Sequence, residues 1–419
     1  MSDTLLPVIE QLPVLRKSLR ISVVTETYPP EVNGVSISVA RFVEGLCALN
    51  HEIQLVRPRQ DPADAAHQRD RFREVLRGGV AIPRYPGLRM GLPSGRALLK
   101  LWAARRPDVV HIVTEGPLGW SALQAALRLG IPVCTDFRTN FHAYSAHYGL
   151  GWLKRPIAAY LRKFHNRAAR TLVPTAAMRT DLEGLGFRNV EVVARGVDSG
   201  LFNPARRSAE LRRAWGAADD TPVVVHVGRL AAEKNLPTLA AAFEAMRVRR
   251  PNARFVVVGD GPERAALQDR CPYAIFAGQR SGEDLAAHYA SGEIFLFPSL
   301  TETFGNVTLE AMACGLAVVA FDYAAAREHL RHGVSGMLAN HGDSDGFVAM
   351  AADLVADPRR TRRFAQKARQ AADRLTWESI ARRFEAILLE VAQAEPGPAQ
   401  PDSPSARRAS PRARTYSPT

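Results

Sequence analysis

The residues best suited to chemistry are two glutamates, Glu302 and Glu310, separated by seven residues in the segment S-L-T-E-T-F-G-N-V-T-L-E. Between them stand Gly305, Asn306 and Val307, and a helix that begins there has unpaired backbone N–H groups that bind anions, above all phosphate. Carboxylates beside such a site are poor phosphate ligands but good acceptors for hydroxyl groups. A ligand with phosphate and sugar hydroxyls, such as a sugar nucleotide, fits this pattern. A solvated loop before an ordinary helix is the alternative, because the pattern is short.

The elements around these residues support an anion site. The short apolar run 294–298 predicts a buried strand, and 306–314 has the composition of a helix. Another apolar run, 221–227, is typical of a parallel strand, and Arg229 and Lys234 follow its carboxyl end, where ligands bind in open α/β sheets. An arginine offers a planar fork for a diphosphate and a lysine offers a point charge. A surface salt bridge is the alternative for either cation.

A further apolar strand is expected over 254–258, and it ends in Gly259-Asp260-Gly261-Pro262. The dinucleotide-binding fingerprint requires a third glycine at position 264, where this chain has Arg264. We therefore expect a tight strand-to-helix turn here and no dinucleotide site.

Four motifs together resemble glycosyltransferase family 4: V-G-R-L-A-A-E-K-N-L at 227–236, V-V-V-G-D-G-P at 256–262, F-A-G at 276–278 and F-P-S-L-T-E-T-F-G-N-V-T-L-E-A-M-A-C-G-L at 297–316. The resemblance covers residues 18 to 393, and the combination is specific where each motif alone is weak. It implies an α/β protein of the GT-B architecture, with two facing Rossmann-like domains, parallel sheets and a deep cleft between the domains. It also implies a retaining enzyme.

The resemblance assigns roles to individual residues. It implies that Glu302 holds hydroxyls of the donor sugar, that Glu310 holds the nucleotide ribose, and that Gly34, in E-T-Y-P-P-E-V-N-G-V, lets the backbone approach the donor diphosphate. The residues expected to contact the donor are Gly34, Arg229, Lys234, Gly278, Phe304, Gly305, Asn306, Val307 and Glu310.

The chain departs from the family pattern after an expected first-domain strand. Family members carry a sequence like S-Y-H-T-D there, with the histidine reaching the donor sugar, whereas this chain has Arg138 at the histidine position and His142 four residues on. Either side chain could reach the site, and an arginine would suit an acidic donor sugar. A structural arginine paired with Asp136 or Glu115 is the alternative.

Strand and helix patterns alternate along the chain, which predicts parallel sheets covered by helices on both faces. The segment A-R-G-V-D resembles a family linker and has Arg195 where asparagine is usual. In the first domain we expect strands over 21–25, 52–56, 109–113, 132–136, 171–173 and 191–193, and helices over 35–49, 119–129, 157–170 and 176–185. The expected organisation is an N-terminal extension over 1–17, an acceptor-binding domain over 18–200, a nucleotide-sugar-binding domain over 201–375, a helix over 376–393 that crosses back to the first domain, and a disordered tail over 394–419.

Composition fits a two-domain cytoplasmic enzyme. The 419 residues are 46% hydrophobic, which is enough to form hydrophobic cores. The sequence contains no run of 18 apolar residues, so we expect no transmembrane helix. Acidic residues near the N-terminus argue against a signal peptide. The cysteines at 47, 134, 271 and 314 form no C-x-x-C pair, so we expect neither zinc nor disulfides.

Positive charge is concentrated in the first domain. Residues 1–205 hold 27 Lys and Arg against 17 Asp and Glu, whereas 206–393 hold 24 against 23. The segment 152–170 combines aromatics with seven basic residues, counting His165, and no acid, as in a helix on an anionic membrane surface. An ordinary helix packed through Ile157, Leu161 and Phe164 is the alternative. No aromatic-basic recognition motif points to nucleic acid as a partner.

The expected reaction follows from the bond to be broken. Negative charge grows on the departing diphosphate, and Arg229, Lys234 and the helix start near Gly305 are placed to stabilise it. The D-S-D at 343–345 follows the last expected strand, and we interpret it as a helix cap; we therefore expect no metal and no cofactor.

These inferences predict a cytoplasmic, peripheral-membrane, retaining glycosyltransferase that moves a hexose from GDP-mannose or a UDP-hexose to a lipid or glycan acceptor. A sugar-nucleotide epimerase and a catalytically silent binding protein on the same fold are the alternatives.

Overall fold

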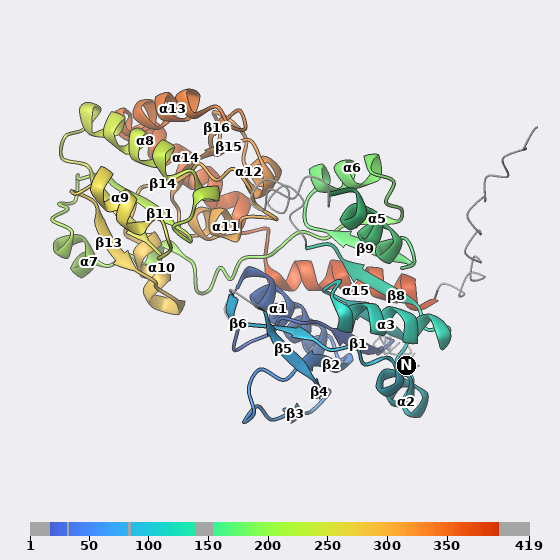
Figure 1. The fold of residues 1–419 in the computed structure, drawn as a ribbon. Coiled ribbons are helices and arrows are strands. Elements are labelled where there is room, and N and C mark those ends of the chain that lie inside the picture. The colour runs from blue at the N-terminus through green and yellow to red at the C-terminus, as the bar shows by residue number, and fades with distance from the viewer. Residues whose placement is uncertain (1–16, 32, 83–84, 139–153, 394–419) are drawn as a thin grey trace, which may run out of the picture.

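The computed structural model describes residues 17–31, 33–82, 85–138 and 154–393 (Figure 1). His142, the segment before residue 17 and the tail after residue 393 lie outside the described residues. The chain forms two α/β domains, each with a mainly parallel sheet between helices (Figure 1). No helix in the described part of the chain is long and apolar enough to cross a membrane.

The sheet of the first domain has eight strands in the order β10-β9-β8-β7-β1-β2-β4-β3, and every neighbouring pair is parallel except β3 with β4. Its strands are β1 Arg20–Val24, β2 Glu52–Pro58, β3 Gln68–Arg69, β4 Phe72–Arg77, β7 Val109–Ile112, β8 Val133–Asp136, β9 Arg170–Val173 and β10 Val190–Val192. All six strands expected from the sequence are confirmed. The sequence interpretation missed β3, β4 and an antiparallel hairpin of β5 Gly79–Ile82 and β6 Tyr85–Gly91.

Helices cover both faces of this sheet. One face packs on α1 and α15, and the other packs on α2, α3 and α5. The helices are α1 Gly34–Ala48, α2 Gly95–Ala104, α3 Pro117–Arg128, α5 Lys154–His165, α6 Ala176–Gly184 and α15 Trp377–Gln393. The helix expected over 157–170 ends earlier, at His165, because the chain must turn before β9 begins at Arg170.

The last helix, α15, packs on the first domain although it follows the second domain in the chain (Figure 1). The ring of Phe384 lies 4.8 Å from the rings of both Phe42 and His111, centroid to centroid. A backbone bridge between Val197 and Thr376 holds the two connecting segments together. The helix therefore ties the end of the second domain to the core of the first.

The second domain has a six-stranded parallel sheet in the order β13-β12-β11-β14-β15-β16. Its strands are β11 Val223–Val227, β12 Arg254–Val258, β13 Ile275–Gly278, β14 Ile294–Phe297, β15 Ala317–Phe321 and β16 Gly336–Ala339. Its helices are α7 Ala209–Ala214, α8 Leu236–Arg249, α9 Arg264–Arg270, α10 Gly282–Ala290, α11 Asn306–Ala313, α12 Ala324–His329, α13 Ser344–Ala356 and α14 Pro358–Ala372, with short 3₁₀ turns η2 Pro204–Arg206 and η3 Ala232–Lys234.

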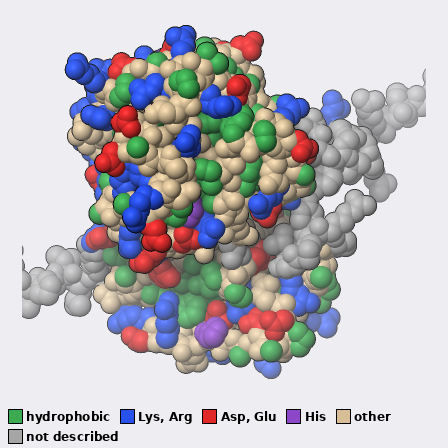
Figure 2. All heavy atoms as spheres, turned by 90° about the vertical axis from the view of Figure 1, so that its left-hand side faces the viewer, with side chains coloured by type: hydrophobic (Ala, Val, Ile, Leu, Met, Phe, Trp, Pro, Cys, Tyr) green, Lys and Arg blue, Asp and Glu red, His purple; other side chains and the backbone are tan. Residues whose placement is uncertain are grey.

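The apolar run of β11 shows why this sheet is buried on both sides. Val223, Val225 and Val227 pack with α10 and α11, whereas Val224 packs on the opposite face with α8 and α13. Since successive side chains of a strand point to opposite faces, a continuous apolar run fits a strand between two helical layers. Seen from the side, the second domain lies above the first with a recess between them (Figure 2).

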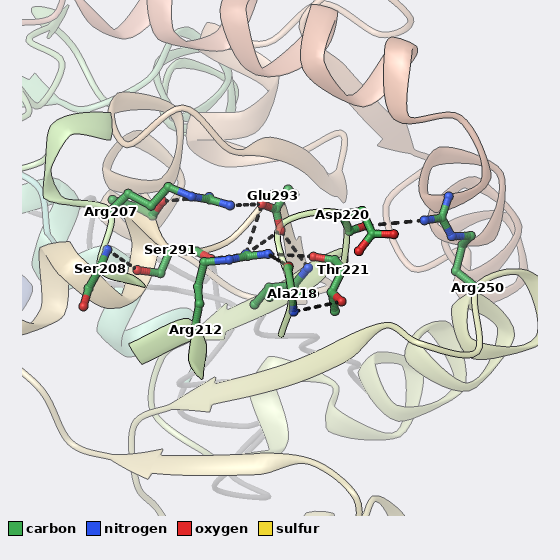
Figure 3. Close-up of polar contacts among 11 residues, drawn as sticks. Arg207, Ser208, Arg212, Ala218, Asp220, Thr221, Arg250, Ser291 and Glu293 are labelled. Atoms are coloured by element: carbon green, nitrogen blue, oxygen red, sulfur yellow. Dashed lines mark hydrogen bonds and ion pairs between the residues drawn. The ribbon is translucent and has the colours of Figure 1, made fainter. Parts of the chain in front are cut away.

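A polar network fixes the amino ends of β11 and β14 (Figure 3). The buried guanidinium of Arg212 donates to Glu293 at 3.1 and 3.2 Å and to the carbonyls of Ser291, Ala218 and Thr221 at 2.9, 2.6 and 2.9 Å. Glu293 also accepts from the backbone N–H of Val223 at 2.7 Å. The network thus holds two strands whose opposite ends carry the expected site.

We predict that Arg212→Ala lowers the free energy of unfolding by on the order of 3 kcal/mol, because the carboxylate and the carbonyls lose a buried charged partner. The neighbouring Arg213 is exposed, so Arg213→Ala is the matched control and should change stability by less than about 0.5 kcal/mol. Thermal unfolding of both variants measures the difference. Equal midpoints would contradict the importance of this network.

Candidate functional site

The loops at the carboxyl edge of the second sheet touch backbone to backbone. A Cβ atom built on Gly259 would lie 1.9 Å from the carbonyl oxygen of Gly228, and one on Gly261 would lie 2.3 Å from that of Leu230. Only glycine tolerates this approach, so the G-x-G is a close turn, as the sequence predicted. It fixes the loop that carries Arg229 and Lys234 after β11.

The amino end of α11 is not capped by a side chain. Its N-cap is Gly305, whose left-handed backbone (φ 90°) turns the chain into the helix, and no side chain accepts a hydrogen bond there. The first N–H groups of a helix have no partner within the helix and carry the positive end of its dipole. Asn306 and Val307 begin the helix, and the preceding Phe304 is buried, with its carbonyl accepting from Ala325 N–H at 2.8 Å. The predicted helix start is confirmed, and no described side chain caps its first N–H groups.

Glu302 lies beside this helix start and is held by the loop after β11. Its carboxylate pairs with the Lys234 ammonium, and Ser299 donates to the same oxygen at 2.7 Å. The Lys234 ammonium also lies 5.5 Å from the centre of the Phe297 ring. Both ion-pair side chains are largely buried. The loop after β11 and the loop before α11, which the sequence predicts to meet, do meet. Lys234 of the first loop pairs with Glu302 of the second.

The other residues expected to contact the donor are more open. Arg229 is exposed, and among the described residues no ion pair involves its side chain. Gly278 ends β13 with a positive φ of 74° and has free space around it. Gly34 begins α1 in the first domain, and a Cβ atom on it would lie 3.8 Å from the side-chain nitrogen of Asn306. The starts of α1 and α11 therefore face each other across the two domains.

Glu310, a half-buried residue of α11, accepts a hydrogen bond from the buried Tyr289 hydroxyl at 2.9 Å. Burial raises the pKa of Glu310 to about 7, against the opposing effect of this hydrogen bond. The carboxyl group therefore changes its charge near neutral pH.

Arg138 is buried and pairs with Asp136, the last residue of β8, with Nε donating to Oδ2 at 3.0 Å. This is the contact that the structural alternative predicts. Burial alone would raise the pKa of Asp136, but Arg138 and a hydrogen bond from His111 hold it below its usual range. The other expected residue of this segment, His142, is not among the described residues.

Three contacts of the site were not predicted: Ser299 and Tyr323, which bond the side chain and carbonyl of Glu302, and Tyr289 under Glu310. Ser299 belongs to the quoted motif and could have been found from it. The two tyrosines come from α10 and from the turn between β15 and α12, and no local signal links them to the glutamates. The side chain of Asp343 accepts from Gly346 N–H at 2.9 Å and caps α13, so the D-S-D is a helix cap, as predicted.

Solved structures with this two-domain arrangement are GT-B glycosyltransferases. Sucrose-phosphate synthase from Thermosynechococcus elongatus matches with a TM-score of 0.72 and 20% identity, covering 89% of this chain and 99% of that one. Anabaena Alr3699/HepE in complex with UDP and glucose matches with a TM-score of 0.68 and 19% identity, covering 89% of this chain and 100% of that one. These similarities show the fold, which is α/β of the GT-B type.

Sequence comparison gives the family. The profile described as Glycosyltransferase Family 4 matches residues 32–201, and that described as Glycosyl transferases group 1 matches residues 221–357. A GDP-mannose-dependent alpha-mannosyltransferase of Mycolicibacterium smegmatis is 35% identical over 382 residues, which are 88% of this chain and 98% of that protein. The sulfoquinovosyl transferase SQD2 of Arabidopsis thaliana is 31% identical over 376 residues, 87% of this chain and 72% of that protein.

The chain therefore belongs to glycosyltransferase family 4. It is an enzyme that transfers a sugar from a nucleotide sugar, and the epimerase and silent binding protein are set aside.

We predict that Glu310 makes stability depend on pH. Its folded pKa of about 7 lies above the unfolded value of 4.5, so its stabilising contribution is complete below pH 4.5 and is lost as pH rises through 7. The free energy of unfolding of Glu310→Gln, measured relative to wild type, should therefore rise by on the order of 2 kcal/mol between pH 5 and pH 8. Thermal midpoints across this range measure it, and a difference that does not vary with pH would contradict the assignment.

Proposed function

We propose that this enzyme is a retaining, metal-independent hexosyltransferase that uses GDP-mannose or a UDP-hexose as donor. The observation that carries the proposal is the uncapped start of α11 beside the pair of Glu302 and Lys234, at the sheet edge where Arg229 follows β11. Two similar proteins support the donor class, since one relative is a GDP-mannose-dependent mannosyltransferase and one structural neighbour holds UDP and glucose. No cofactor is part of this proposal.

The proposed mechanism stabilises the leaving group. As the bond from the sugar to the diphosphate breaks, negative charge grows on the diphosphate and is met by Arg229, Lys234 and the N–H groups of α11. Glu302 holds sugar hydroxyls and Glu310 holds the ribose. The ammonium of Lys234 can serve Glu302 and a phosphate together, because it has three N–H donors.

The acceptor attacks from the face that the diphosphate leaves. The proposal assigns no residue as a nucleophile, so the new bond forms on the same face. The acceptor hydroxyl gives its proton to a diphosphate oxygen, and the anomeric configuration is kept. We also propose that Arg138 or His142 contacts the donor sugar.

A lipid acceptor at the inner face of the cytoplasmic membrane fits the basic helix α5. Leu161 and Phe164 are buried in the core of the first domain, whereas Arg155 and Lys163 are exposed. The apolar stripe therefore packs inward, as in the alternative of an ordinary helix, and the exposed face carries basic side chains together with Tyr160. Any contact with an anionic surface would be electrostatic and screened by salt. A glycan acceptor is the other possibility within this proposal.

We predict that Glu302→Gln and Arg229→Ala each lower turnover by on the order of 10²-fold, the loss typical for one group that stabilises a developing charge. Arg249→Ala, which removes an exposed arginine from α8 of the same domain, is the matched control and should turn over like wild type. Thermal midpoints near that of wild type would show that the variants are folded. Near-normal turnover of both site variants would sink the proposed mechanism.

We also predict that turnover survives EDTA, because protein cations and N–H groups take the place of a metal at the diphosphate. Turnover is measured in EDTA and again after adding Mn²⁺ or Mg²⁺. Loss of activity in EDTA that the metal restores would show that the metal-independent mechanism is wrong.

For the membrane, we predict that the double variant Arg155→Ser and Lys163→Ser weakens binding to phosphatidylglycerol vesicles at low salt. Each basic residue near an anionic surface is worth about 1 kcal/mol, so the pair should cost roughly 30-fold. Removing the exposed Arg362 and Lys367 of α14 in the second domain is the control for charge alone. Equal losses in both double variants, or equal binding to neutral vesicles, would argue against α5 as the contact.

A further inference from the structure

A buried cluster of charges lies at the carboxyl end of β8 in the first domain. Asp136, Arg138 and Arg195 are exposed by only 3%, 8% and 4% of their surfaces. Arg138 pairs with Asp136, and His111 Nε2 lies 3.5 Å from the same carboxylate. The cluster therefore holds two guanidinium groups around one carboxylate.

Arg195 has no acceptor among the residues that the structure describes. Among the described residues, no hydrogen bond or ion pair involves its side chain, and its guanidinium lies 5.4 Å from the centre of the Phe42 ring. Asp198, three residues on, is already engaged by Arg41 at 2.8 Å and by the N–H of Leu201 at 3.0 Å. The face of the aromatic ring partly stabilises the cation. It does not accept the hydrogen bonds that the guanidinium N–H groups donate in the guanidinium plane.

The positive charge at this position is costly. Burial lowers the pKa of Arg195 to about 9, and repulsion from Arg138 acts in the same direction, while Asp136 opposes both. A buried charge without a hydrogen-bonded partner destabilises a folded protein. Since no described residue accepts a hydrogen bond from this guanidinium, it is placed to bind an anionic group of a ligand.

The cluster lies at the edge of the sheet where a substrate would bind. β8 and β1 run in the same direction through β7, so Asp136 ends at the same edge as the loop that leads from β1 to Gly34. Gly34 faces Asn306 of the second domain, and Arg195 stands in the segment that connects the domains. In open α/β sheets, ligands bind outside the carboxyl ends of the strands.

We propose that Arg138 and Arg195 form a subsite for an anionic group of a substrate, a carboxylate, sulfonate or phosphate ester. Arg195 supplies the free planar fork, and Arg138, oriented by Asp136, supplies the second cation. The inference rests on the proposed function, because the group belongs either to the donor sugar or to the polar head of the acceptor. These two sources share one chemistry and are separated by the experiment.

The first arm measures anion binding itself. Thermal midpoints of wild type, Arg195→Asn and Arg188→Asn are recorded against inorganic sulfate at constant ionic strength, with UDP in excess to occupy the diphosphate site. Arg188 is an exposed arginine of the same domain and controls for the loss of one charge. The apparent sulfate dissociation constant should rise roughly tenfold or more in Arg195→Asn alone, the loss expected for charge-assisted hydrogen bonds.

The same data separate a binding role from a structural one. Without sulfate, Arg195→Asn should be as stable as wild type or more stable, because it removes an unpartnered buried charge. A lower midpoint without sulfate, together with unchanged sulfate binding, would overturn the proposal and make Arg195 a structural residue.

The second arm identifies the source of the anion. The kcat/KM ratio of UDP-glucuronate to UDP-glucose tests the donor, and the ratio of phosphatidylglycerol to diacylglycerol acceptors tests the acceptor, in wild type, Arg195→Asn and Arg138→His. One of the two ratios should fall by roughly tenfold or more in both variants. If neither falls, the proposal is wrong. Failure of the proposed function would instead show as no binding of either GDP or UDP and no effect of Glu302→Gln on turnover, while the sulfate arm still measures binding at the subsite.

Discussion

The site depends on one constraint: helix α11 begins at a glycine. Gly305 adopts a left-handed backbone and brings no side chain to the first N–H groups of the helix. A serine or aspartate at an N-cap stabilises a helix by about 1 kcal/mol because it satisfies those groups. The same side chain would occupy the space of an anion. The absence of a capping side chain therefore leaves room for the diphosphate that we propose to bind there. The close glycine turn after β12 holds the loop that carries Arg229 and Lys234.

The charges of the candidate site are unequally satisfied. In the second domain, Lys234 and Glu302 neutralise each other, and Glu310 is near its pKa at neutral pH. Arg229 is left exposed for a ligand. In the first domain, Arg195 is buried and has no acceptor among the described residues. Unsatisfied positive charge therefore stands on both sides of the interface between the domains, as suits a substrate with more than one anionic group.

The sequence predicted the strands and turns that depend on residues close together in the chain. The apolar runs of β11, β12 and β14 and the glycine turns after them are confirmed almost to the residue, since a buried strand needs continuous apolar sequence. The hairpin of β5 and β6 was missed because its strands have little apolar alternation. The pairing of Lys234 with Glu302 could not be predicted, because 67 residues lie between them. Arg138 and Arg195 were noticed separately, and only the structure brings both to Asp136.

The central claim is that the start of α11 binds the donor diphosphate. A crystal structure of the enzyme with GDP or UDP tests it most directly. The account predicts β-phosphate oxygens within about 3 Å of the N–H groups of Asn306 and Val307, the distance of a normal hydrogen bond, with Arg229 and Lys234 turned toward them. A diphosphate bound elsewhere, with the helix start facing only water, would contradict it.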